Sequence, residues 1–263
     1  MIRTIRCEWT RLKSRNYIVG GIGLMAALGL IVTVIVFFTA KGGSAMTPLG
    51  GQTVSVATLE ASDGMFAGLR LAANMWGIVA LVVWAIATAS DYSNGLIRLL
   101  VQAEPRRLRL IAGKAIALTV FTCIATLVTM LIVMIASPAI AGATGISAAA
   151  WTTDLAHNIA NGYLHLTLAA LMWGFVGLFV GVMTRSTGIS IAVGIGYLLV
   201  FEMLFGMLLK SGAKWLPGSS FSTVAAGGTT DMSFGTGLLV ALGYVVVTRA
   251  LAAVTFRRRD ITA

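Results

Sequence analysis

The chain has 263 residues, a formal net charge of +10, and only 11% charged side chains against 58% hydrophobic ones. A soluble domain carries about a quarter charged residues, so this chain has too few to cover a surface in water. The composition excludes an ordinary soluble protein and predicts an all-α membrane protein. The positive charge does not indicate nucleic-acid binding, because the basic residues gather at the ends of apolar segments and lack an aromatic reading surface.

Residues 1–16 form the first predicted element, an amphipathic helix that precedes any membrane span. Its apolar side chains recur at steps of three and four residues, the spacing of one helix face, at Ile2, Ile5, Trp9 and Leu12. Basic residues take the other faces. A helix of this kind lies in the membrane interface, so we expect it on the inner membrane surface. A solvated basic tail is the alternative.

Six apolar segments follow, at residues 17–38, 69–90, 115–140, 162–183, 189–209 and 236–256. Each is long enough to cross a hydrocarbon core of about 30 Å as a helix. The segments are continuously apolar and do not alternate, which favours helices over a β-barrel. Residues 17–263 are therefore predicted to form one transmembrane domain of six helices.

Lysine and arginine are distributed unevenly between the two sides of this domain. Of the 19 basic residues, 15 lie on or near one side, and the other side holds only Lys41, Arg70, Lys210 and Lys214. Positive residues concentrate in cytoplasmic loops. We therefore expect both termini in the cytoplasm, with residues 91–114 as the first cytoplasmic loop.

The second half of the chain contains three further features. Glu202 is the one acid placed deep in a predicted span, where a charge costs about 2.5–3.5 kcal/mol. It either bonds to another helix or lines a substrate pathway. Gly177 and Gly181 form a G-x-x-x-G pattern that lets helices approach closely, within the chain or at a dimer seam. Residues 210–235, which include Leu216-Pro217, are semi-apolar and could dip back into the membrane from the outer side.

Enzyme signatures are absent from the sequence. It contains no G-x-x-x-x-G-K-[ST], no H-E-x-x-H and no G-x-S-x-G pattern. His157 and His165 are the only histidines, too few for a zinc site of three or four ligands. Cys7 and Cys123 are predicted at different depths, which disfavours a disulfide. We expect no metal, no bound cofactor and no catalytic residue in this chain.

The first cytoplasmic loop, residues 91–114, is a charged island between two long apolar segments. Gly95 to Gln102 predicts a short helix that ends before Pro105. The arginines of this loop could pair with acids on a soluble partner. A basic membrane anchor without a partner is the alternative that composition alone favours.

At these residues the sequence resembles the permease subunits of ABC-2-type ABC transporters. That family's stretch after its second span reads Glu-x-x-x-Gly-Thr-[Ile/Leu]-[Arg/Lys]-x-Leu-Leu, then Pro-x-x-Arg, then Gly-Lys. The corresponding residues are Asp91-Tyr-Ser-Asn-Gly95-Leu-Ile-Arg98-Leu-Leu100, then Pro105 to Arg109, then Gly113-Lys114. Asp91 replaces the usual Glu, and Leu96 replaces the usual Thr. The resemblance implies six spans, an N-terminal interfacial helix and a semi-buried segment before the last span.

The resemblance also implies a function, the export of a substrate driven by a separate ATPase subunit that carries the ATP and Mg. The short loop helix would be the coupling helix, and the implied coupling residues are Asp91, Gly95, Arg98, Pro105, Arg106 and Arg107. Two ATPase copies and a second permease chain, identical or related, would complete the transporter in a bacterial plasma (inner) membrane. The apolar spans favour a hydrophobic or amphipathic cargo. A membrane anchor or sensor that recruits a soluble protein remains the alternative.

Overall fold

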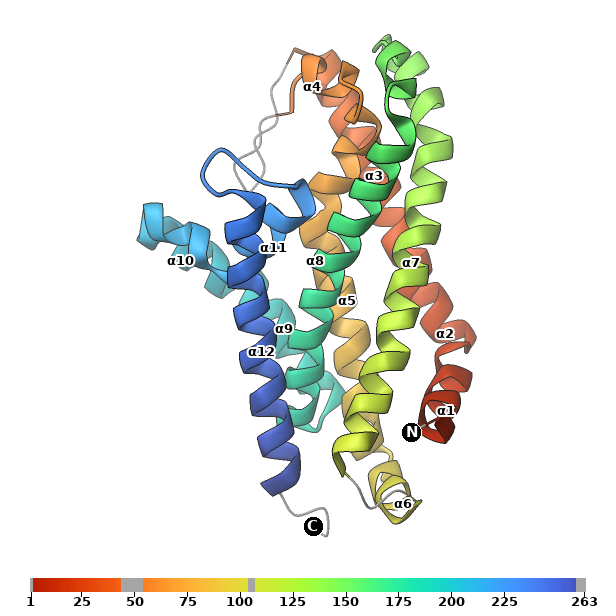
Figure 1. Cartoon of the computed structure of the whole chain (residues 1–263), viewed down its shortest axis with the longest axis vertical. Coiled ribbons are helices and arrows are strands. Elements are labelled where there is room, and N and C mark those ends of the chain that lie inside the picture. Colours follow the sequence, from red (N-terminus) through yellow and green to blue (C-terminus); the bar gives the residue numbers. More distant parts are fainter. Residues whose placement is uncertain (1, 44–53, 104–106, 259–263) are drawn as a thin grey trace.

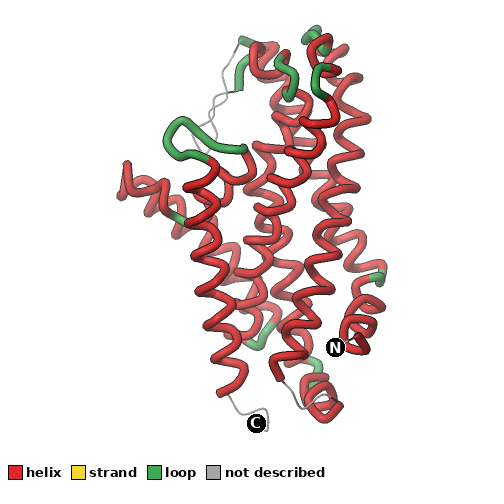
Figure 2. The backbone as a smooth tube through the Cα atoms, viewed as in Figure 1, coloured by secondary structure: helices red, strands yellow, loops and turns green. Residues whose placement is uncertain are grey.

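The computed structural model describes residues 2–43, 54–103 and 107–258, which fold into helices joined by short connections (Figures 1 and 2). Five helical segments within these residues are long and apolar enough to cross a membrane. They are Arg15–Lys41, Gly64–Ser93, Leu108–Thr144, Leu155–Thr184 and Phe234–Phe256. They coincide with five of the six predicted spans, so the chain is a multi-pass helical membrane protein.

The centre of the bundle is the pair α5 (Ala67–Ser93) and α8 (Leu155–Thr184), in each of which 67% of the most apolar stretch is buried. Glycines on α8 bring the two backbones together. A Cβ on Gly177 would overlap the carbonyl oxygen of Leu81, and a Cβ on Gly181 would lie 2.8 Å from that of Ala85. Small residues permit this approach, so the G-x-x-x-G pattern lies at a contact within the chain.

Three long helices surround this pair: α3 (Leu24–Lys41), α7 (Arg107–Thr144) and α12 (Phe234–Arg258). A short π-helical turn, η1 (Ile18–Gly23), leads into α3. The outer connections carry α4 (Val56–Glu60), η2 (Gly64–Phe66) and η3 (Ala149–Thr152). The Trp151 indole N–H donates to the Leu59 carbonyl over 2.8 Å and ties two of these connections together.

The predicted fifth span, residues 189–209, is not one long helix. The chain forms α9 (Thr187–Gly196), a π-helical turn η4 (Tyr197–Phe201) and α10 (Glu202–Leu209). Figure 1 shows α10 projecting sideways from the bundle. Hydropathy and length are the same for a straight span and a bent one, which is why the sequence pattern predicted a single helix here.

The segment at residues 210–235 turns back toward the bundle. It begins as a 3₁₀ helix, η5 (Lys210–Trp215), and continues as α11 (Pro217–Ala226). Proline at the first position of α11 suits a helix start. Phe221 is fully buried, with its ring 4.9 Å from that of Trp173. α11 is therefore packed against α8 and α12 rather than exposed as a loop.

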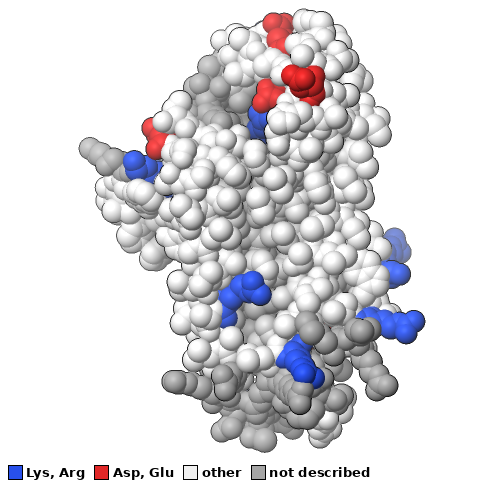
Figure 3. Space-filling view, in the orientation of Figure 1, with Lys and Arg blue, Asp and Glu red and all other residues white. Residues whose placement is uncertain are grey.

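Charge separates along the long axis of the molecule. Figure 3 shows most visible Asp and Glu side chains near one end and most visible Lys and Arg side chains toward the other. The N-terminal helix α1 (Ile2–Leu12), the short helix α6 (Leu96–Ala103) and the end of α12 share the basic end (Figure 1). This arrangement is consistent with the orientation predicted from the basic residues, with this end in the cytoplasm.

Candidate functional site

At the basic end of the molecule, α1 packs against the beginning of α7. Leu12 is 2% exposed, and a Cβ on Gly113 would lie 3.0 Å from the Thr4 methyl group. This docking turns Glu8, which is 6% exposed, toward the bundle, and Arg11 lies one turn further along the same side of α1. The helix predicted to lie in the interface thus presents an acid and a base to the protein as well as apolar residues.

The last turn of α5 presents Asp91, which is only 2% exposed. α5 ends at Ser93, and the chain then turns sharply at Gly95, whose φ is +69°. Glycine adopts this left-handed conformation without strain, which explains why it stands between α5 and α6. Gly95 therefore sets the direction in which α6 leaves the bundle.

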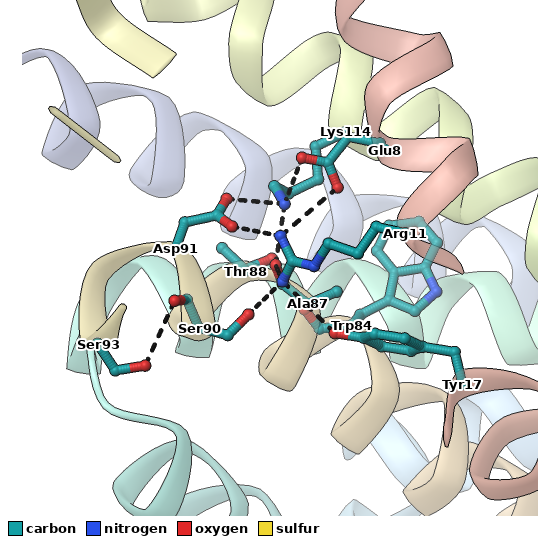
Figure 4. Close-up of polar contacts among 10 residues, drawn as sticks. All are labelled: Glu8, Arg11, Tyr17, Trp84, Ala87, Thr88, Ser90, Asp91, Ser93 and Lys114. Atoms are coloured by element: carbon teal, nitrogen blue, oxygen red, sulfur yellow. Dashed lines mark hydrogen bonds and ion pairs between the residues drawn. The ribbon is translucent and has the colours of Figure 1, made fainter. Parts of the chain in front are cut away.

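Lys114 completes a four-residue charge cluster with Glu8, Arg11 and Asp91 (Figure 4). Its ammonium group lies 2.9 Å from Glu8 Oε1 and 2.8 Å from Asp91 Oδ2, and it donates to the Ala87 carbonyl over 2.9 Å. An ammonium has three N–H donors, so these three acceptors satisfy all of them. Lys114 itself is 7% exposed and lies inside α7, not in a loop.

Arg11 closes the cluster from the other side. Its guanidinium pairs with Asp91, donates to Ser90 Oγ, and donates to the Ala87 carbonyl over 3.0 Å. Burial lowers the pKa of Arg11, but the charge of Asp91 and the hydrogen bonds to Asp91 and Tyr17 outweigh it and raise the pKa above its usual value. Arg11 therefore stays cationic, and the two acids and two bases balance.

The cluster joins three elements that are distant in the sequence: α1, the end of α5 and the start of α7. Buried ions are costly to desolvate, and removing one partner of a buried pair typically costs about 3–5 kcal/mol. Such a network fixes geometry more than it adds net stability. The beginning and end of the α6 connection are thus held to α1 at one point.

The helix between these anchor points, α6, agrees with the short helix predicted from Gly95 to Gln102. Ile97 is 9% exposed, whereas Leu96 and Leu99 are 40% and 62% exposed. Among the other predicted coupling residues, Pro105 and Arg106 lie outside the described residues. The side chains of Arg98 and Arg107 are also outside the described part of the structure.

Glu8, Arg11 and Lys114 were not recognised as a set from the sequence. Arg11 and Asp91 are 80 residues apart, and nothing local connects them. The available signal was the scarcity of acids at the basic end. An acid in an otherwise basic helix and an acid at the end of an apolar span both require a partner, because unpaired buried charges are rare.

Glu202, predicted either to bond another helix or to line a pathway, lies apart from this cluster, at the start of α10. Its Oε1 accepts a hydrogen bond from the Ser219 backbone N–H over 3.0 Å, at the beginning of α11. The residue before Ser219 is Gly218, and a Cβ on it would overlap the Glu202 carboxylate. The geometry therefore includes a bond between helices. Whether Glu202 also meets a substrate stays a prediction.

Fold and site together define a multi-pass helical membrane protein with a buried charge cluster behind a short helix at its basic end. The family described as "Protein of unknown function (DUF2705)" matches residues 29–262. Because this match covers most of the chain, the protein belongs to that family. A search of curated proteins found no match.

Proposed function

We propose that this chain is the transmembrane permease subunit of an ABC-2-type exporter, driven by a separate ATPase that binds ATP and Mg. The observation that carries the proposal is α6. This helix lies at the same end as α1 and the end of α12, outside the five long apolar helices (Figure 1). Its Leu96 and Leu99 side chains are exposed. Apolar side chains exposed at a water-facing end favour contact with a soluble protein.

The connections of α6 supply a route by which a partner's motion would enter the bundle. Just before α6, Asp91 at the end of α5 pairs with Arg11 and Lys114. The next residue, Tyr92, lies with its ring edge-on to that of Phe256 of α12, and the two ring centroids are 6.5 Å apart. A displacement of α6 would therefore reach α1, α5, α7 and α12 together. This is the rigid-body kind of transition that ligand binding biases.

The same proposal includes the assembly and the cargo. Two ATPase copies would serve two permease chains, identical or related, in a bacterial plasma membrane with both termini cytoplasmic. The cargo would be hydrophobic or amphipathic, because the helices are apolar and bear few fixed charges. The resemblance of residues 91–114 to ABC-2 permeases supports the class of transporter, and the placement of α6 supports the docking role.

The test is co-purification of the chain with an ATPase subunit, followed by ATP turnover and export in vesicles. Leu99→Glu should weaken the complex at least about tenfold, because it puts a charge into an apolar contact. Gln102→Glu is the matched control, since it adds the same charge at an exposed position of α6 without removing an apolar side chain. Gln102→Glu should weaken the complex less than Leu99→Glu does.

Charge reversal at Asp91 would be a poor test of docking, because that carboxylate is buried in the cluster and its loss affects folding. Unchanged binding and turnover in Leu99→Glu would refute the coupling role of α6. A partner held through α6 without any ATP-dependent transport would instead favour the anchor or sensor function.

A further inference from the structure

The start of α11 lacks a capping side chain of its own. Residue Leu216 occupies the N-cap position, and its apolar side chain cannot accept a hydrogen bond. The first N–H groups of a helix have no partner inside the helix. Glu202, which is 17 residues before Ser219, supplies the missing acceptor, because its carboxylate accepts a hydrogen bond from the Ser219 N–H. A carboxylate also interacts favourably with the positive end of the helix dipole.

The Glu202 carboxylate is only half satisfied in this position. The backbone N–H groups of Gly218 and Ser219 both favour the charged carboxylate, and Ser219 donates to Oε1, but Oε2 is buried without a hydrogen-bond partner. No ion pair to Glu202 occurs among the described residues, whose ion pairs involve Asp63, Asp91 and Glu8. A buried carboxylate oxygen without a partner is costly, so a proton is the simplest group that would relieve it.

The titratable groups around Glu202 come from three neighbouring elements. The Glu202 carboxylate interacts electrostatically with Tyr197 of η4 and with Tyr244 of α12. The Tyr244 hydroxyl is engaged elsewhere, since it donates to the Trp215 carbonyl over 3.0 Å. In η5, the Lys214 ammonium lies 5.8 Å from the Trp215 ring centroid, and the side chain of Lys210 is outside the described part. α11 itself contains no titratable side chain.

Release of this contact would free one end of a helix that is packed inside the molecule. The buried face of α11 includes Phe221 and Val224, and its far end stops at Gly227, whose φ is +77°. Next to Glu202, the chain has already changed from the α-helix of α9 to the π-helical turn η4. The Glu202 contact therefore joins an irregular, projecting segment to a packed one.

We propose that Glu202 is a proton-controlled latch: ionised, it holds the N-terminus of α11 against α10, and protonated, it lets that end move. Ionisation favours the closed state because both the hydrogen bond to a charged acceptor and the dipole interaction strengthen with the negative charge. Acidification should therefore open the latch, and alkaline pH should close it. This inference does not depend on the exporter function.

A nitroxide label on α11 reports the latch directly. The label is placed at Ser222→Cys in the full-length chain in vesicles, with Cys7→Ser and Cys123→Ala to remove the native thiols. The mobility spectrum is recorded between pH 4 and pH 9. The ratio of mobile to immobile label should rise as the pH falls. In Glu202→Gln this ratio at alkaline pH should be about tenfold higher than in the chain with Glu202, and it should no longer respond to pH.

Four control variants separate the latch from general effects. Glu60→Gln removes another acid that accepts a backbone N–H, that of Ser147, and should leave the response unchanged. Tyr197→Phe and Tyr244→Phe should also keep it. A label at exposed Thr152→Cys should show no pH response. An immobile label in Glu202→Gln at alkaline pH, or a pH response that persists in that variant, would overturn the proposal.

Discussion

Asp91 and Glu202 are two carboxylates withdrawn from water, and the chain stabilises them in different ways. Asp91 is 2% exposed and contacts two cations from two other helices. Glu202 has no such cation among the described residues and accepts a backbone N–H at a helix start. A buried ion network is costly to break, whereas a helix terminus contributes about 2 kcal/mol at most. The ion network around Asp91 therefore suits a permanent connection between helices, here called the joint, and the Glu202 contact suits a reversible one.

The strongest test of this difference removes the charge of Asp91 without changing its shape. Asp91→Asn leaves Arg11 and Lys114 with only Glu8 as a counter-charge, and it should cost about 3–5 kcal/mol of the free energy of unfolding. Unfolding by denaturing detergent in mixed micelles, followed by circular dichroism, measures this loss. Asp231→Asn, at an exposed acid of the outer connection, is the control. Equal stability of the two variants would show that the cluster is not a joint.

A second test exploits the lack of space at Gly218. A Cβ there would overlap the Glu202 carboxylate, so Gly218→Ala should destabilise by about 1–3 kcal/mol through overpacking. In a Glu202→Ala background most of this cost should disappear, because the obstructing group is gone. Detergent unfolding of the two single variants and the double variant gives the comparison. An undiminished cost in the double variant would mean that the carboxylate does not lie against Gly218.

The sequence predicts the long helices well because a membrane span is a one-dimensional pattern. Twenty apolar residues in a row are sufficient evidence, and Gly95 and Pro105 bracket α6 in the same local way. Five spans and the short helix could therefore be placed without knowing any tertiary contact. The basic residues add an orientation, which stays a prediction.

The sequence does not reveal the features that depend on contacts between residues distant in the chain. Residues 189–209 have the composition of a span, yet the chain changes to a π-helical turn at Tyr197–Phe201 and α10 projects from the bundle. Glu202 meets Ser219 only because α11 folds back. The charge cluster likewise combines α1 with residues 80 and more positions later. No local sequence pattern predicts such long-range contacts, although an acid in an apolar or basic segment does indicate that it has a partner elsewhere in the chain.

A third test asks whether the charge cluster and the Glu202 contact act independently. Glu8→Gln and Asp91→Asn both remove an acid that contacts Lys114, so the double variant should lose about 1–2 kcal/mol more than the sum of the single losses. Glu8→Gln combined with Glu202→Gln should be additive within about 0.5 kcal/mol, because these groups share no partner. The same unfolding measurement serves both cycles. Coupling between Glu8 and Glu202 would contradict the separation of joint and latch.

The smallest effect is expected at a partly exposed carboxylate, that of Asp63, whose side chain is 39% exposed and pairs with Arg70 over 2.7 Å. The distance is as short as those in the cluster, but water screens the pair. Asp63→Asn should therefore cost about 0–1 kcal/mol, and the loss should shrink further when the ionic strength is raised. The loss in Asp91→Asn should hardly change with salt, because that carboxylate is buried. Measuring both variants in low and high salt separates the effect of burial from that of distance. A large, salt-independent loss at Asp63 would show that distance alone governs these ion pairs.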